Sequence, residues 1–138
     1  MKKNILLLAL VLILCHSLSA QKAPYKVVFD VTSSDTVLHK MVLRWVGEVL
    51  TADPNAEVEV VFYAKSLDMI TKDKSTVADN VMKFAAKKNV AFRVCSVAMK
   101  NNNVEKSQLL EGVGTVPDGI YEIISKQHEG WGYIKAAR

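Results

Sequence analysis

Residues 25–50 read YKVVFDV-TSSD-TVLHKMVLRWVGEVL, and this stretch decides the fold. Tyr25 to Val31 is rich in β-branched and aromatic residues, which predicts a strand. The polar run Thr32 to Asp35 supplies side chains that cap a helix by accepting its unpaired backbone N–H bonds. From Thr36 to Leu50 the apolar residues recur every three or four positions, which predicts an amphipathic helix. A strand followed directly by a capped helix is typical of an α/β protein.

The same alternation continues along the rest of the chain. Further strands are predicted at residues 57–63, 90–95, 113–116 and 131–135, and further helices at 77–88, 104–110 and 120–128. The connector at 64–74 is expected to hold one helical turn around Leu67 to Ile70. In the last helix Ile120, Ile123 and Ile124 are expected to face inward, and Gly130 to end it. We predict a mostly parallel sheet covered by helices on both faces, in one domain over residues 21–138, with the strand order open.

Residues 1–20 are predicted to be an export signal peptide, outside the folded domain. Lys2 and Lys3 form a positive start, and the apolar run at residues 5–15 is short for a membrane span. Ala20 ends a series of small residues that suits cleavage. Cys15 raises the alternative of a lipoprotein, but the residue before it is Leu14, where lipoprotein processing requires a small residue. We therefore expect a periplasmic or secreted protein with no membrane attachment after cleavage.

Composition and motifs disfavour several classes of function. Loss of Lys2 and Lys3 lowers the formal net charge of +4 by two, and the basic residues form no stripe interleaved with aromatic residues, so nucleic acid is not an expected partner. The sequence has no glycine-rich dinucleotide fingerprint, no zinc-ligand spacing, no Cys-x-x-Cys pair and no nucleophile elbow. Neither a cofactor nor a metal is predicted, and whether the protein is an enzyme stays open.

Cys95 is the main candidate for chemistry. After signal cleavage it is the only cysteine, and it ends the apolar run VAFRVC at residues 90–95. In an open α/β sheet, ligands collect beyond the carboxyl ends of the strands, and a helix starting beside the thiol would favour the thiolate. The alternatives are that Cys95 forms an intermolecular disulfide bridge or is a small buried apolar residue, and the sequence leaves reactive and structural interpretations open. A weaker hypothesis pairs Cys95 with Met99, four residues on, as soft ligands for copper(I).

Other candidate binding residues follow the other strand ends. They are Ser33 and Ser34 after the first strand, Lys65 after the second and Ser96 after the third. Each also has an ordinary structural interpretation, since serines before a helix act as caps and lysines are common on surfaces. The loop at residues 32–35 contains no glycine and carries Asp35, which would repel an anion, so we expect it to cap a helix and not to bind phosphate.

Several stretches together resemble one known family. They are VAFRVCSVAM at residues 90–99, LLEGV at 109–113, VPDGI at 116–120 and QHEGWGYI at 127–134, with the strand around Phe29-Asp30-Val31. This combination resembles the DsrE/DsrF-like family, in its small single-domain branch, over nearly all of the mature chain. The resemblance implies a three-layer α/β/α fold around a parallel five-stranded sheet, and a homo-oligomer, often a trimer or hexamer.

The resemblance also implies a function for Cys95. Better-studied relatives are sulfur-relay proteins in which a strand-end cysteine accepts and passes a persulfide sulfur, and Cys95 matches that position. The leading hypothesis is therefore an exported protein that handles sulfur as a persulfide acceptor or carrier, with a small sulfur compound or a sulfur-donor protein as partner. The chain departs from those relatives in its export signal and in lacking an obvious partner cysteine. The alternative is a non-enzymatic homo-oligomeric module that binds a small ligand or another protein.

Overall fold

The sheet has five strands, all parallel, in the order β4-β3-β2-β1-β5. The computed structural model describes residues 24–137. The strands are β1 (Lys26–Val31), β2 (Glu57–Phe62), β3 (Val90–Cys95), β4 (Val113–Val116) and β5 (Gly132–Ala136). β1, β2 and β3 are thus flanked by strands on both sides, which explains why most of their residues are buried.

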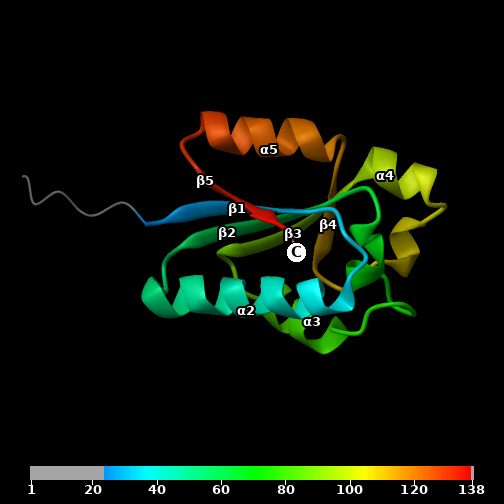
Figure 1. Ribbon diagram of the computed structural model, residues 1–138, viewed down its shortest axis with the longest axis horizontal. Helices are drawn as coiled ribbons and strands as arrows, with labels where there is room; N and C mark the ends of the chain where they lie inside the picture. The colour runs from blue at the N-terminus through cyan, green and yellow to red at the C-terminus, as the bar shows by residue number, and fades with distance from the viewer. Residues whose placement is uncertain (1–23, 138) are drawn as a thin grey trace, which may run out of the picture.

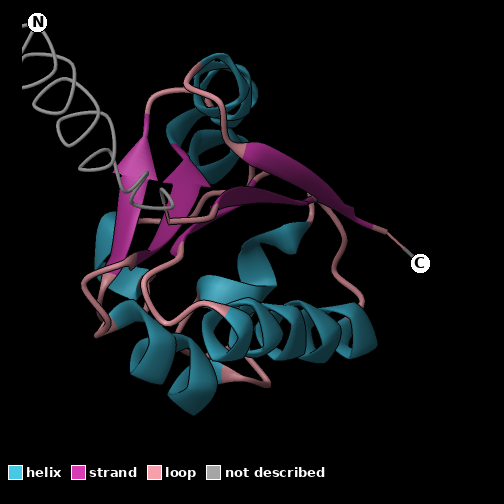
Figure 2. Ribbon diagram, turned by 90° about the vertical axis from the view of Figure 1, so that its left-hand side faces the viewer, coloured by secondary structure: helices cyan, strands magenta, loops and turns pink. Residues whose placement is uncertain are grey.

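Helices cover both faces of this sheet. The helical elements are α2 (Thr36–Ala52), η1 (Ser66–Ile70), α3 (Ala78–Ala85), α4 (Ser96–Asn101), η2 (Lys106–Gln108) and α5 (Gly119–His128). α2 and α3 lie on one face, α5 lies alone on the other, and α4 lies near the carboxyl ends of the strands (Figure 1; Figure 2). The predicted three-layer α/β/α fold with a parallel five-stranded sheet is confirmed.

Most of the apolar core lies between the sheet and α2 and α3. Alternate strand residues point to this face, among them Phe29, Phe62 and Phe92, each with 0% of its surface exposed. The rings of Phe62 and Phe92 stack with their centroids 5.9 Å apart. Full burial of such a side chain contributes on the order of 2–3 kcal/mol, so this layer supplies most of the stability.

The face under α5 is much less apolar. Its cluster of buried apolar side chains contains only Val28, Val61 and Ile123. Two carboxyl side chains, Asp30 and Glu59, are also buried on this face, each with 4% of the residue exposed. Buried carboxyl groups require partners, so the polar contacts of this face matter to both stability and function.

Local signals in the sequence explain several boundaries. Asp35 caps α2 by accepting from the Val37 backbone N–H at 2.8 Å, as predicted. The expected turn around Leu67 to Ile70 is confirmed as η1. Gly130 follows α5 with φ of +85°, a conformation that favours glycine.

Three details of the prediction are wrong. α3 ends at Ala85, before the predicted Lys88, and only a short 3₁₀ turn, η2, lies within the predicted helix at 104–110. Ile120 and Ile124 face outward, each with 56% of its surface exposed, because α5 has the sheet on one side only and turns Gly119 and Ile123 toward it. The outer face of α5 is therefore apolar.

The predicted signal peptide at residues 1–20, including Cys15, lies outside the described residues. Within residues 24–137, no helix has the length and apolar character needed to cross a membrane.

Candidate functional site

Cys95 lies at the carboxyl edge of the sheet, at the junction of two elements. It is the last residue of β3 and the N-cap of α4, so the helix begins directly at Ser96. The neighbouring strand β4 pairs Val116 with Cys95. The Cys95 side chain makes no capping hydrogen bond to α4, and 6% of the residue is exposed. The thiol is thus free of a disulfide and mostly covered.

Cys95 lines a hollow of about 460 Å³ at this edge of the sheet. Apolar walls come from Val97 and Ile120, and polar ones from Tyr63, Lys65, Asn102 and Asp118, among others. The hollow is within the size range of small-molecule sites and combines apolar walls with a few polar groups. A second hollow of about 330 Å³ shares Lys65 and Asn102 with it and extends to Ser34 and Asp68.

The residues predicted for binding do not all gather around the thiol. Lys65 lies with Cys95 in the first hollow, and Ser34 lies with Lys65 in the second. Ser33 is used by the fold, since its hydroxyl accepts from the Asp35 N–H at 3.1 Å and its carbonyl accepts from His39 Nε2 at 2.8 Å. Ser96 is exposed at the start of α4 and lines neither hollow.

Gly119 explains why a Pro-x-Gly sequence follows β4. A Cβ atom at this position would lie 3.1 Å from the Cys95 Cβ, 3.2 Å from the Val61 Cγ1 and 3.5 Å from the Tyr63 Cδ1. A larger residue would require these neighbours to shift by a few tenths of an ångström, so glycine favours the close approach of the start of α5 to the sheet. The first turn of α5 therefore forms part of the cover over Cys95.

A buried polar cluster lies next to this hollow and was not predicted. Asp30 Oδ2 accepts from the Tyr133 hydroxyl at 2.7 Å and from Lys135 Nζ at 3.0 Å, and Lys135 also donates to Thr32 Oγ1 at 3.3 Å. Lys135 lies 5.7 Å from the centre of the Tyr63 ring, which connects the cluster to the wall of the hollow. The one available signal in the sequence is a charged residue, Asp30, inside an otherwise apolar strand.

The cluster raises the pKa of two phenols. Burial raises the pKa of Tyr63 to about 12, and the negative charge of Asp30 adds to the rise. The hydrogen bond to Asp30 raises the pKa of Tyr133 to about 12, and burial adds to it. Both phenols therefore stay neutral even in alkaline solution, and the Tyr63 side chain lies between Asp30 and the hollow that Cys95 lines.

The copper(I) alternative receives no supporting cluster. Cys95 and Met99 are both buried at α4, and His39 is held by Ser33. Among the residues that the structure describes, no three His, Cys, Asp or Glu side chains are placed to hold a metal ion.

Comparisons with known proteins give the family and the fold. A model of the DsrE/DsrF-like family matches residues 26–136. MTH1491 from Methanobacterium thermoautotrophicum, described as a protein of unknown function, is 28% identical with a TM-score of 0.76, over 80% of this chain and 98% of that one. The ychN protein from E. coli is 10% identical with a TM-score of 0.68, over 81% of this chain and 98% of that one. No curated protein matches the chain.

Proposed function

The chain belongs to the DsrE/DsrF-like family, and on that premise we propose that it accepts and carries sulfur on Cys95. The observation that supports this most is the place of Cys95, at the end of β3 in a hollow of about 460 Å³ with Lys65 and Tyr63 on its walls. The hollow has space for a small sulfur compound, and Lys65 brings positive charge to its wall. The export signal expected at residues 1–20 would place this chemistry in the periplasm or outside the cell.

The proposed step is an exchange between a thiolate and a persulfide. The Cys95 thiolate attacks the outer sulfur of a donor R–S–SH, a new S–S bond forms, and the old S–S bond breaks. The donor leaves as the thiolate R–S⁻, and Cys95 becomes Cys–S–SH. An acceptor thiolate reverses the step by attacking the same outer sulfur. No external oxidant or reductant is needed, since the sulfur moves between two thiols.

We expect the protein to take up one sulfur atom per chain when incubated with a low-molecular-weight persulfide. Intact mass spectrometry measures the uptake, with Cys15→Ser as background so that Cys95 is the only thiol. Cys95→Ser in the same background is the control and should gain nothing. The proposal would be contradicted if the mass of the protein with Cys95 stays unchanged while its thiol still reacts with an alkylating agent.

A second proposal concerns assembly, since the outer face of α5 is apolar. Ile120, Tyr121 and Ile124 have 56%, 71% and 56% of their surfaces exposed, and Val97 on α4 has 51%. Ile120 and Val97 also line the hollow at Cys95. Contiguous exposed apolar side chains are typical of an interface. We propose that a second copy of this chain packs there, so that the homo-oligomer completes the wall of the site.

Ile124→Asp is expected to convert the oligomer into a monomer, because it places a charge in the centre of the proposed interface. Sedimentation velocity measures the change. Val37→Asp is the matched control, since Val37 is 47% exposed but lies on α2, on the opposite layer, and should leave the assembly intact. A wild-type protein that sediments as a monomer, or an Ile124→Asp variant that still assembles, would contradict the proposal.

A further inference from the structure

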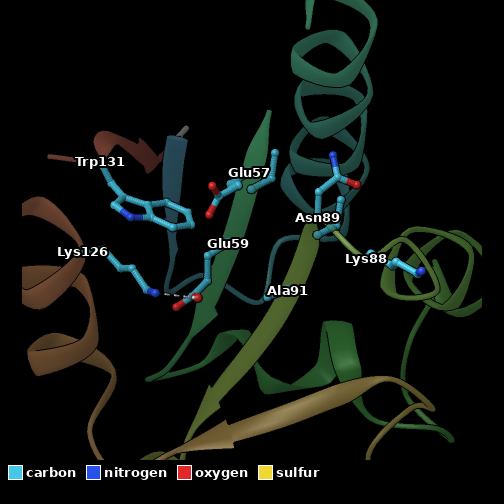
Figure 3. A pocket seen from close by; sticks show the side chains of 9 residues that line it. Glu57, Glu59, Lys88, Asn89, Ala91, Lys126 and Trp131 are labelled. Atoms are coloured by element: carbon cyan, nitrogen blue, oxygen red, sulfur yellow. Dashed lines mark ion pairs between the residues drawn. The ribbon is translucent and has the colours of Figure 1, made fainter. Parts of the chain in front are cut away.

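α5 is attached to the sheet by a small apolar contact and by a polar one. The buried residues of the apolar contact are Val28, Val61 and Ile123, and the partly buried Tyr63 and Trp131 pack against them. The polar contact lies toward the C-terminal end of α5, where Lys126 reaches down to Glu59 on β2 (Figure 3). An element held by few buried apolar side chains opens more readily than the core, so its polar contacts have a large influence on its attachment.

Glu59 is the buried centre of this contact. It lines a hollow of about 340 Å³ with Lys126 and Trp131, at the amino-terminal ends of β2 and β3 (Figure 3). Its Oε2 lies 3.5 Å from Lys126 Nζ, while its Oε1 is buried and receives no hydrogen bond from an N–H or hydroxyl group. The Glu122 carboxyl group of α5 lies close by, since the same Lys126 Nζ that lies 3.5 Å from Glu59 Oε2 lies 3.7 Å from Glu122 Oε1. Two carboxyl groups around one ammonium group repel one another unless one of them holds a proton.

The surrounding charges do not neutralise two carboxylates. On α5, Lys126 lies 3.7 Å from Glu122 Oε1 and 3.9 Å from Glu129 Oε2, so one ammonium group serves three carboxyl groups. The Lys126 ammonium group also lies 4.6 Å from the centre of the Trp131 ring, and this contact helps to hold it in place.

The neighbouring strands add little positive charge. On β3, Arg93 attracts the Glu59 charge more weakly than Lys126 does. On β2, Glu57 is itself negative and is paired with Lys26 of β1 at 3.0 Å. A proton on the Glu59–Glu122 pair therefore offsets the excess negative charge at this contact.

We infer that the proton shared by Glu59 and Glu122 is a pH-sensitive latch that holds α5 on the sheet and keeps Cys95 covered. This inference rests on the proposed function for its purpose, since α5 begins at Gly119, directly over Cys95 and Val61. When the proton is released to solvent, two buried carboxylates repel one another and α5 opens more often. The latch thus links the pH of the surroundings to access to the thiol.

The direction of the pH effect follows from Glu59. Burial raises the pKa of Glu59 from 4.5 to about 7, Lys126 opposes the rise, and Glu122 adds to it. For a carboxyl group whose pKa is higher in the folded state, the stabilising contribution is complete below the unfolded-state value and is lost as the pH rises through the folded-state value. α5 is therefore held most firmly at about pH 4.5 and below, and it loosens as the pH rises from there to about 7.

Glu59→Gln tests the latch, because glutamine keeps the shape and donates a hydrogen bond to Glu122 without titrating. Hydrogen exchange of the α5 amides, followed by mass spectrometry on the full chain, gives the protection of the helix. At about pH 8.5 we expect α5 in the wild type to be at least roughly tenfold less protected than in Glu59→Gln, and at about pH 4.5 to be equally protected within about twofold. Glu57→Gln, on the same strand but half-exposed, should behave as the wild type does.

Glu122→Gln provides a second variant, since it removes the same repulsion from the helix side. It should also abolish the loss of protection at high pH. The latch proposal is wrong if the α5 amides of the wild type and of Glu59→Gln show the same protection at both pH values. It is also wrong if Glu57→Gln alters the pH dependence as much as Glu59→Gln does. The measurement involves no sulfur chemistry, so its failure is distinct from a failure of Cys95 to take up sulfur.

Discussion

Replacement of Asp30 by alanine is expected to lower the free energy of unfolding by about 2 kcal/mol. The substitution removes the acceptor of two hydrogen bonds, from Tyr133 at 2.7 Å and from Lys135 at 3.0 Å. It leaves the Lys135 ammonium without its counter-ion on the α5 face of the sheet. Both donors lie on β5, the edge strand that pairs with β1, so the attachment of this strand is weakened as well.

Urea denaturation of Asp30→Ala beside the wild type measures this effect. Asp68→Ala is the control, because Asp68 makes an exposed ion pair with Lys74 at 3.3 Å. Such a surface pair contributes at most about 1 kcal/mol. Equal losses in the two variants would show that the buried cluster has no special role in stability.

The cluster also bears on the site. Tyr63 lines the hollow at Cys95, and Lys135 lies over its ring. Because the raised pKa of Tyr63 owes part of its rise to Asp30, removal of Asp30 also makes the phenol easier to ionise. The same substitution thus changes the electrostatics of the hollow as well as the stability of the fold.

The family and the layered architecture could be predicted from the sequence because their signals are local. At residues 25–50 the spacing of the apolar residues distinguishes the strand from the helix, and Asp35 between them caps α2 with its side chain. Cys95 could be placed at a strand end for the same reason, since the apolar run ends at that residue.

The parts that could not be predicted depend on contacts across the chain. Asp30 meets Tyr133 and Lys135 more than one hundred positions later in the sequence, and only the pairing of β1 with β5 brings them together. The isoleucines of α5 have a helical spacing that fits a buried helix equally well. The exposure of Ile120 and Ile124 follows from α5 lying alone on its face of the sheet, which depends on the topology.

The second large effect is expected in the rate at which the Cys95 thiol is alkylated. Cys95 is 6% exposed, yet it borders a hollow of about 460 Å³ whose cover is the first turn of α5. A thiol sealed in an apolar core reacts only when the protein unfolds, whereas a thiol at the wall of a hollow reacts from the folded state. The two situations differ by several orders of magnitude in rate.

The most direct test is the alkylation rate of native Cys95 by iodoacetamide, in a Cys15→Ser background, compared with the same chain unfolded in urea. Our account predicts that the native thiol reacts at neutral pH within roughly tenfold of the unfolded chain. A native rate lower by about a thousandfold, no faster than global unfolding, would show that Cys95 only fills space at the end of β3.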